Sequence, residues 1–250
     1  MDLFGAKSEN RAFGLRLCGM LLLAGCAAPV AQVVDDPYEI ENRSMHAFNV
    51  GLDRNLLQPM AAGGSNVPPE VWQGVGNFAD NLQAPGEVVN SLLQFRLGAA
   101  VENTLRFGLN TIVGVGGLFD PATAMGVNGR HTDFGETLHV WGVGEGAYME
   151  LPVFGPSTQR DTLGMVVDYA INPIRLLVPE PEVYIDTAAQ LLSKVGDRSR
   201  YSETFDSLLY DSADSYAQAR LLYLQNRRYQ LGQTSGEDSY VDPYEDPYAQ

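Results

Sequence analysis

The chain has 250 residues, 45% of them hydrophobic, and a formal net charge of −15 at pH 7. Nucleic acid and anionic lipid headgroups repel so acidic a protein, which argues against DNA or RNA as a partner. The two cysteines, Cys18 and Cys26, both lie near the N-terminus, so the remaining chain has no thiol for a disulfide, a zinc site or nucleophilic catalysis.

The first 25 residues predict a secretory signal peptide. Lys7, Arg11 and Arg16 precede a short apolar run, residues 17–24, which is too short to span a bilayer as a helix. Because Cys26 directly follows Ala-Gly, the segment resembles a bacterial lipoprotein signal, in which this cysteine is lipidated and becomes the new N-terminus. An ordinary signal peptide with an incidental cysteine is the alternative.

We predict a covalent diacylglyceryl group and an acyl chain on Cys26, and no other cofactor. A single chain anchors a protein only marginally, whereas two signals give stable attachment. Residues 26–36 are predicted to form a lipidated tether between this anchor and a single, mainly α-helical domain over residues 37–231.

Apolar residues at helical spacing begin after the tether and recur along most of the chain. Residues 37–59 predict a first helix, and residues 60–69, with two Gly and two Pro, predict a loop. Residues 86–95 and 97–113 predict two further helices. The apolar residues that define the first helix are Ile40, Met45, Phe48, Leu52 and Leu56.

The helix predicted over residues 97–113 has two distinct faces. The apolar face, which could meet lipid or pack a soluble core, comprises Leu97, Val101, Leu105, Leu109 and Ile112. The polar face comprises Glu102, Asn103, Arg106 and Asn110. Glu102 and Arg106 have the i,i+4 spacing of an ion pair.

A glycine-rich turn follows at residues 114–121. The uncharged stretch 107–119 is too short to cross a bilayer, so we predict no ordinary transmembrane span in the mature chain. Residues 126–161 are rich in glycine and aromatic residues and predict loops and short extended segments. Helices are predicted over residues 160–169, 183–195 and, as one long helix, 202 to 230, before an acidic disordered tail at 232–250.

Sequence motifs for catalysis are absent: there is no G-x-S-x-G, no H-E-x-x-H and no phosphate-binding loop. His131 with Asp133 could form a general base and its partner, and His131 with His139 half a metal site, but structural histidines are commoner. Glu145 and Glu150 could serve a hydrolase as acid and base, although solvated loop charges explain them equally simply. We predict no catalytic residue, no metal site and no enzyme.

Short motifs are spread over positions 35–210, and they include Asp36-Pro37-Tyr38-Glu39, Asn42-Arg43, Phe48-Asn49, Val75-Gly76-Asn77-Phe78, Arg106-Phe107, Leu109-Asn110-Thr111-Ile112, Gly114, Gly116-Gly117, Gly142-Val143-Gly144, Leu151-Pro152 and Gly155-Pro156-Ser157-Thr158. Together these spaced residues resemble the MlaA (VacJ) family of Gram-negative outer-membrane lipoproteins.

The resemblance implies a ring-like helical protein, lipid-anchored at the periplasmic face of the outer membrane beside a trimeric porin. It implies that the protein takes mislocalised phospholipid from the outer leaflet and passes it to the periplasmic phospholipid carrier of the Mla pathway. This retrograde transport maintains outer-membrane lipid asymmetry. The alternatives are a structural porin-associated lipoprotein and a lipoprotein hydrolase of phospholipid or cell wall.

The resemblance also implies roles for seven residues of the lipid passage and its gate. Phe48 and Asn49 match a position on the first helix whose packing controls a glycine-rich loop. Leu109 and Asn110 precede that loop, and its glycines, by analogy a flexible gate, are Gly114, Gly116 and Gly117.

Overall fold

A computed structural model describes residues 36–179, 181 and 184–233. The predicted signal peptide, the lipidation site Cys26, most of the tether and the tail beyond residue 233 lie outside these residues. Helices form most of the described part, together with one two-stranded sheet. The elements in chain order are α2 (Glu39–Leu52), η1 (Asp53–Leu57), α3 (Gln58–Gly63), η2 (Gly64–Asn66), α4 (Pro69–Leu93), α5 (Leu97–Ile112), α6 (Pro121–Ala124), α7 (Phe134–Val140), β1 (Tyr148–Leu151), β2 (Gly155–Thr158), α8 (Gln159–Ile171), α9 (Pro173–Leu177), α10 (Tyr184–Arg200), α11 (Ser202–Asp206), η3 (Ser207–Asp211) and α12 (Ser215–Gln230).

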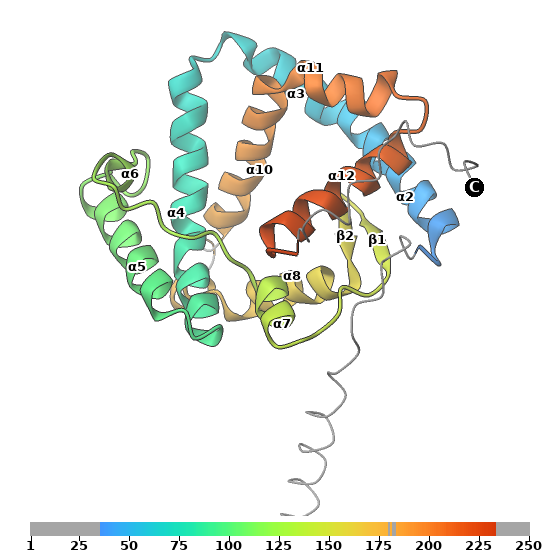
Figure 1. Ribbon diagram of the computed structural model, residues 1–250. Coiled ribbons are helices and arrows are strands. Elements are labelled where there is room, and N and C mark those ends of the chain that lie inside the picture. Colours follow the sequence, from blue (N-terminus) through green and yellow to red (C-terminus); the bar gives the residue numbers. More distant parts are fainter. Residues whose placement is uncertain (1–35, 180, 182–183, 234–250) are drawn as a thin grey trace, which may run out of the picture.

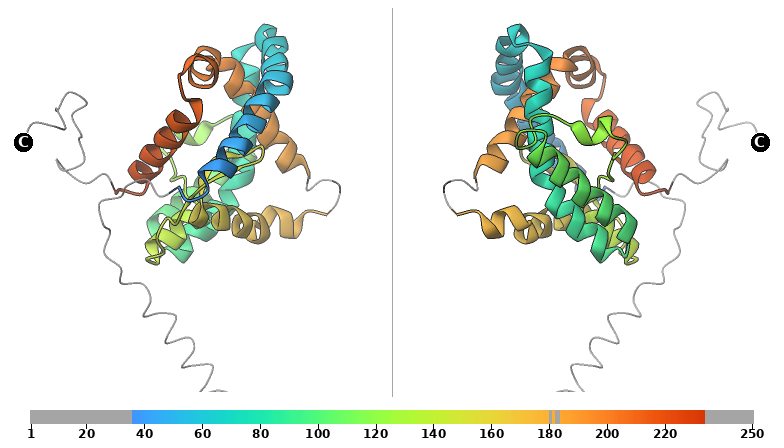
Figure 2. Two further views of the ribbon diagram at one scale, coloured as in Figure 1. Left: turned by 90° about the vertical axis from the view of Figure 1, so that its right-hand side faces the viewer. Right: turned by 90° about the vertical axis from the view of Figure 1, so that its left-hand side faces the viewer.

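The helices follow one another around a ring, as the family resemblance implies (Figure 1). Helices α4 and α5 form one side, α7 and α8 lie along the bottom, and α2 runs along the opposite side beside the antiparallel β1–β2 hairpin. Helix α10 packs against α4, and α12 packs near β2. Views from the two sides place α2 and α5 on opposite sides of the ring (Figure 2).

The prediction of a mainly helical domain is confirmed, and α5, α8 and α10 match their predicted segments closely. None of the helices in the described residues is both long and apolar enough to cross a membrane. Other segments differ from their predictions, and each difference has a local physical cause.

The single long helix predicted over residues 202–230 is wrong. After α11 and the π-helical turn η3, the chain becomes extended at Ser212 (ψ 146°), and α12 starts afresh at Ser215. The side chain of Asp214 caps the new helix by accepting a hydrogen bond from the backbone N–H of Ala217 at 3.0 Å. A carboxylate at this position satisfies a helix-terminal N–H that otherwise has no partner, so the Asp–Ser cluster favours a restart.

The loop predicted at residues 60–69 is also wrong, because the first helix continues through η1 and α3 as far as Gly63. The helix predicted at residues 86–95 is the C-terminal part of the 25-residue α4. Pro69 is the first residue of α4, a position where proline is tolerated because its missing N–H has no intrahelical partner. The two prolines at 68 and 69 therefore mark a helix start.

Residues 126–161 contain the predicted extended segments as β1 and β2, but they also contain the helix α7. Asp133 caps this helix by accepting from the N–H of Glu136 at 2.7 Å. The helical spacing of apolar residues cannot be recognised in this segment, because α7 has only seven residues. That is less than two helical turns.

Polar contacts hold the ring together more than an apolar core does. Among the described residues, most fully buried apolar side chains are alanines, and buried polar or charged residues outnumber them. A small cluster of large side chains comprises Tyr148, Tyr216 and Leu224. Many large apolar side chains face outward instead, which is unusual for a protein whose whole surface meets water.

Candidate functional site

Helix α5 turns its apolar face outward and its polar face inward. Leu97, Val101 and Ile112 are 64%, 61% and 83% exposed, whereas Asn103 and Asn110 are buried. The structure therefore decides between the two environments left open for this face: it does not pack a protein core. Exposed apolar surface of this extent marks a contact with lipid or with another protein.

Arg106 on the inner face does not pair with Glu102, as its spacing predicted. Its guanidinium donates to Asp120 at 2.7 Å instead, while Glu102 accepts a hydrogen bond from the N–H of Gly129 at 3.2 Å. Arg106 and Glu102 thus both bind the segment of residues 120–129. These contacts hold α5 with its apolar face pointing away from the protein.

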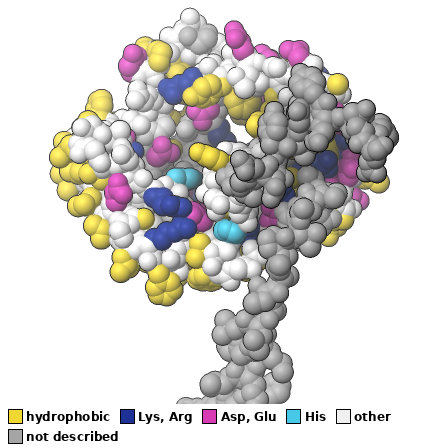
Figure 3. Space-filling view, viewed as in Figure 1, with side chains coloured by type: hydrophobic (Ala, Val, Ile, Leu, Met, Phe, Trp, Pro, Cys, Tyr) yellow, Lys and Arg dark blue, Asp and Glu magenta, His cyan; other side chains and the backbone are white. Residues whose placement is uncertain are grey.

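The apolar surface continues beyond α5 onto the neighbouring turns. Phe95 precedes the helix, Val113 and Val115 follow it, and Phe119 ends the next turn; all four are exposed. Figure 3 shows hydrophobic side chains mainly along the outer rim of the molecule. Charged and histidine side chains lie nearer the middle of the same view.

The glycine turn after α5 is tightly packed. Gly117 has φ +99°, and a Cβ there would lie 2.5 Å from the Cβ of Asn81 on α4. A Cβ on Gly114 would lie 2.3 Å from the carbonyl oxygen of Phe119. Gly116 has φ +74° but open space around it. Two of the three glycines are therefore required for close approach, and Gly116 for its backbone conformation.

Asn81 and Asn77 fasten this turn to α4. The amide of Asn81 donates to Thr111 Oγ1 at 3.0 Å and to the carbonyl of Gly116 at 3.4 Å, and Asn77 donates to the carbonyl of Leu118 at 3.3 Å. The family resemblance includes Asn77, but the sequence assigned neither asparagine a role. Their i,i+4 spacing on one helix was the available signal.

Leu109 and Asn110 lie directly before the turn. The carbonyl of Leu109 accepts hydrogen bonds from the N–H groups of Val113 and Gly114. The buried side chain of Asn110 donates to Asp120 at 3.0 Å and accepts from the N–H of Ala122 at 3.1 Å. These five predicted residues, 109, 110, 114, 116 and 117, therefore come together as one structural unit.

Phe48 and Asn49 lie elsewhere, on α2 at the opposite side of the ring (Figures 1 and 2). Asn49 donates to the carbonyl of Leu151 at 2.9 Å and accepts from the N–H of Val153 at 2.8 Å, while Phe48 is exposed. The hydrogen bonds of Asn49 thus hold the β1–β2 hairpin, and within the described residues none reaches the glycine turn. The role of this pair in controlling the turn stays a prediction.

His46 joins three elements through a buried hydrogen-bond chain. Its Nδ1 lies 3.3 Å from Glu150 Oε1 on β1, and its Nε2 lies 3.1 Å from the hydroxyl of Ser215 on α12. Tyr148 also donates to Glu150, at 2.5 Å. Hydroxyl, imidazole and carboxylate in this order occur in acyl-transfer triads, and sequence reasoning missed the set because its members are far apart in the chain.

The other predicted pairs take different partners. His131 lies 2.5 Å from Glu87 on α4, and Asp133 binds Arg227 at 2.7 Å, so His131 and Asp133 do not pair. Glu145 binds Arg228 at 2.7 Å. Among the described residues, no group of three or more His, Cys, Asp or Glu side chains is placed to hold a metal ion.

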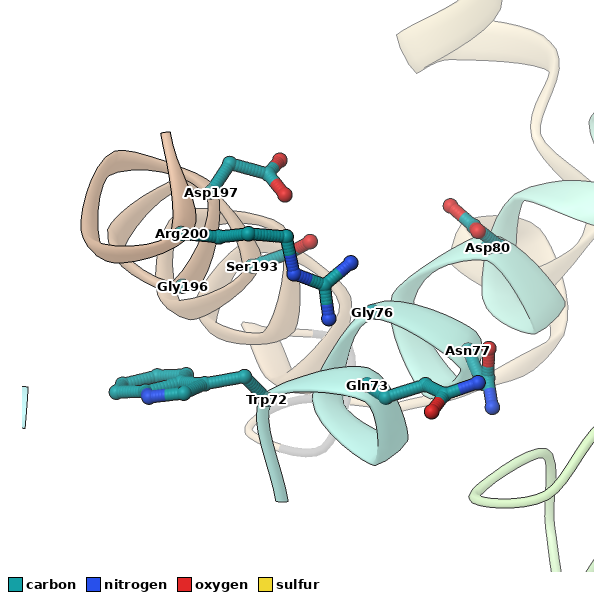
Figure 4. A pocket seen from close by; sticks show the side chains of 9 residues that line it. All are labelled: Trp72, Gln73, Gly76, Asn77, Asp80, Ser193, Gly196, Asp197 and Arg200. Atoms are coloured by element: carbon teal, nitrogen blue, oxygen red, sulfur yellow. The ribbon is translucent and has the colours of Figure 1, made fainter. Parts of the chain in front are cut away.

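A polar cavity of about 220 Å³ lies between α4 and α10. Figure 4 shows Arg200 reaching from α10 toward α4, with Trp72 below it and Asp80 further along α4. Gly196 on α10 allows the indole of Trp72 to approach, because a Cβ there would lie 2.9 Å from its ring. A cavity of this composition can hold a small charged group.

Comparisons with known proteins agree on one family. The family model for "MlaA lipoprotein" matches residues 34–230. The Escherichia coli "Intermembrane phospholipid transport system lipoprotein MlaA" is 35% identical over 246 residues, covering 93% of this chain and 91% of that protein. An uncharacterised protein of Rickettsia typhi is 35% identical over 189 residues, covering 75% of this chain and 74% of its own length. A solved structure described as "Structural basis for maintenance of bacterial outer membrane lipid asymmetry" is 30% identical, with a TM-score of 0.67 over 78% of this chain and 98% of that chain.

Proposed function

Because the chain belongs to the MlaA lipoprotein family, we propose that it is an outer-membrane lipoprotein that removes phospholipid from the outer leaflet for retrograde transport. In this role it maintains the lipid asymmetry of the outer membrane. A soluble periplasmic carrier receives the phospholipid, and a trimeric porin holds the protein in place. Cys26 carries the lipid anchor, on the periplasmic face of the membrane.

The observation that carries this proposal is the inverted polarity of the ring. The outward face of α5 and the turn after it offer apolar side chains to acyl chains, while charged and histidine side chains lie nearer the middle of the ring (Figure 3). A phospholipid headgroup cannot enter hydrocarbon cheaply, since unsatisfied polar groups there cost several kcal/mol. Polar surfaces inside an apolar rim lower that cost.

Deletion of the gene in its own host tests this function. We expect outer-leaflet phospholipid and detergent sensitivity to rise, and the wild-type gene to restore both. A double variant, Val101→Glu with Leu105→Glu, should be expressed and folded but fail to restore them, because it places two carboxylates on the apolar face of α5. Unchanged leaflet composition after deletion would leave the structural porin-associated role or a hydrolase.

A hydrolase is the second candidate, because Ser215, His46 and Glu150 lie in the order of a catalytic triad. His46 and Glu150 are buried, and the chain of hydrogen bonds joins α2, β1 and α12; both features favour a structural role. We expect purified protein to release no product from labelled phospholipid. Turnover that disappears in Ser215→Ala would favour the enzyme instead.

A further inference from the structure

The cavity between α4 and α10 is lined by exposed charged side chains that make no hydrogen bond or ion pair with another described residue. Arg200 makes no hydrogen bond or ion pair with any other described residue, and the same holds for the side chains of Asp80 and Asp197, which line the same cavity. Elsewhere in the ring, arginine side chains are mostly paired with carboxylates, as Arg198 is with Asp53. Opposite charges that share a cavity but do not pair are available to a ligand.

The cavity is built rigidly on two helices. Helix α10 packs against α4, and Gly196 on α10 leaves room for the ring of Trp72 on α4, because a Cβ there would lie 2.9 Å from the ring. Trp72 is fixed at one end, because its indole N–H donates to the carbonyl of Gly64 at 3.3 Å and a Cβ on Gly64 would lie 2.6 Å from its ring. Sites on packed helices hold their ligand groups more accurately than sites on loops.

The cavity lies next to the apolar turn. Asn77, which lines the cavity, also donates to the carbonyl of Leu118. Gly74 lies near the same carbonyl, because a Cβ added to it would be 3.5 Å from the carbonyl oxygen. Leu118 and its neighbour Phe119 are exposed. A polar cavity that borders an apolar surface matches a molecule with a charged head and apolar tails.

We propose that this cavity is a subsite for a zwitterionic phosphate–ammonium headgroup. The guanidinium of Arg200 binds the phosphate, with Gln73 and Asn77 as neutral donors, and the carboxylates of Asp80 and Asp197 bind the ammonium. An arginine binds phosphate oxygens through charge-assisted hydrogen bonds, often two at once. The inference rests on the proposed lipid transport and adds the headgroup class that the ring selects.

Trp72 provides a direct measurement of binding. The chain has two tryptophans, so the variant Trp141→Phe leaves Trp72 as the only one. The full-length lipoprotein in non-ionic detergent is titrated with dihexanoyl phosphatidylethanolamine, dihexanoyl phosphatidylglycerol, phosphoethanolamine and inorganic phosphate. We expect saturable changes in Trp72 fluorescence with phosphatidylethanolamine at lower concentration than with phosphatidylglycerol.

Two substitutions in the cavity separate the two charges of the headgroup. Arg200→Gln should weaken phosphatidylethanolamine binding by about tenfold or more, because it removes a charge-assisted contact. Asp80→Asn should weaken phosphatidylethanolamine binding but leave phosphatidylglycerol binding unchanged or stronger. Arg54→Gln is the matched control, because Arg54 is an exposed helical arginine whose guanidinium lies over the ring of Tyr210, outside the cavity.

Three results would overturn the subsite: equal binding by Arg200→Gln and Arg54→Gln, inorganic phosphate bound as tightly as phosphoethanolamine, or Asp80→Asn affecting both lipids alike. Arg200→Lys, which keeps the charge, should retain part of the binding. That result would show that the loss in Arg200→Gln comes from the missing charge and not from misfolding. Complementation of the deletion separates this inference from the function it rests on. If wild type restores asymmetry and Arg200→Gln does so equally, the subsite fails; if wild type itself does not, the transport function fails.

Discussion

Arg198 on α10 binds Asp53 at the start of η1 across 145 residues of sequence. Its Nε donates to Asp53 Oδ1 at 2.9 Å and its Nη2 to Oδ2 at 3.1 Å, and Tyr210 donates to the same carboxylate at 2.6 Å. Both ion-pair partners are buried, at 3% and 5% exposure. The contact joins the first helical segment to the later helices, in a protein that has little apolar core.

Arg198→Gln should therefore lower the free energy of unfolding by about 3–5 kcal/mol, because it leaves the carboxylate of Asp53 buried without its counter-charge. Arg43→Gln is the matched control. Arg43 pairs with Glu39 and Asp214 at the surface, where such pairs contribute at most about 1 kcal/mol. Urea unfolding followed by circular dichroism measures both, and equal losses would contradict the structural role of the buried pair.

The glycine turn gives a second matched pair of substitutions. Gly116→Ala should cost about 1–2 kcal/mol, since only the positive φ is unfavourable there. Gly117→Ala should cost clearly more and impair transport, because its Cβ would also collide with Asn81 and displace the turn. Unfolding midpoints and complementation of the deletion measure the two effects. Similar costs for both variants would mean that the turn adjusts freely.

Acid should destabilise the protein through Asp161. Burial by itself would raise the pKa of this carboxyl, but hydrogen bonds and charge from Arg227 outweigh it and lower the pKa to about 2. A folded-state pKa below the unfolded value of 3.8 contributes stability that is complete above 3.8 and is lost as the pH falls toward 2.

The lowered pKa of Asp161 corresponds to about 2 kcal/mol of folding stability. Urea unfolding between pH 6 and pH 2 should show a steeper loss for wild type than for Asp161→Asn, which is less stable at neutral pH but has no such carboxyl to protonate. Parallel curves for the two proteins would show that this ion pair does not couple stability to pH.

The outward face of α5 should bind lipid. Leu105→Glu should reduce sedimentation of the protein with phospholipid vesicles, because a carboxylate on that face must be desolvated on insertion. Its stability in detergent-free buffer should change by no more than about 0.5 kcal/mol, since the side chain is exposed. Leu105→Met, which keeps the face apolar, is the control, and unaltered vesicle binding by the Glu variant would assign this face to another partner.

Anchoring is expected to depend on Cys26, which lies outside the described residues. Cys26→Ala should shift the protein from the outer-membrane fraction to a soluble or uncleaved form, because it removes the site of acylation. Cell fractionation with immunoblotting measures this shift. A variant that stays in the outer membrane at wild-type levels would show that the apolar surface suffices for attachment.

The sequence alone determined the mainly helical class, the position of α5, α8 and α10, and membership of the family. Helical periodicity is a local property, and many spaced matches together are specific even where each one is weak. Local reasoning failed where short signals compete: Asp133 caps a helix that the apolar pattern does not reveal, and Asp214 caps a helix start inside a segment predicted as one continuous helix.

Only the tertiary structure decided which face of α5 points outward. Periodicity divides a helix into two faces, but the sequence does not say whether protein or another medium lies against the apolar one. The same holds for Asn49 on the hairpin, for His46 between Glu150 and Ser215, and for the cavity at Arg200. Each depends on groups from distant segments, whose proximity is set by the closure of the whole ring and not by any local pattern.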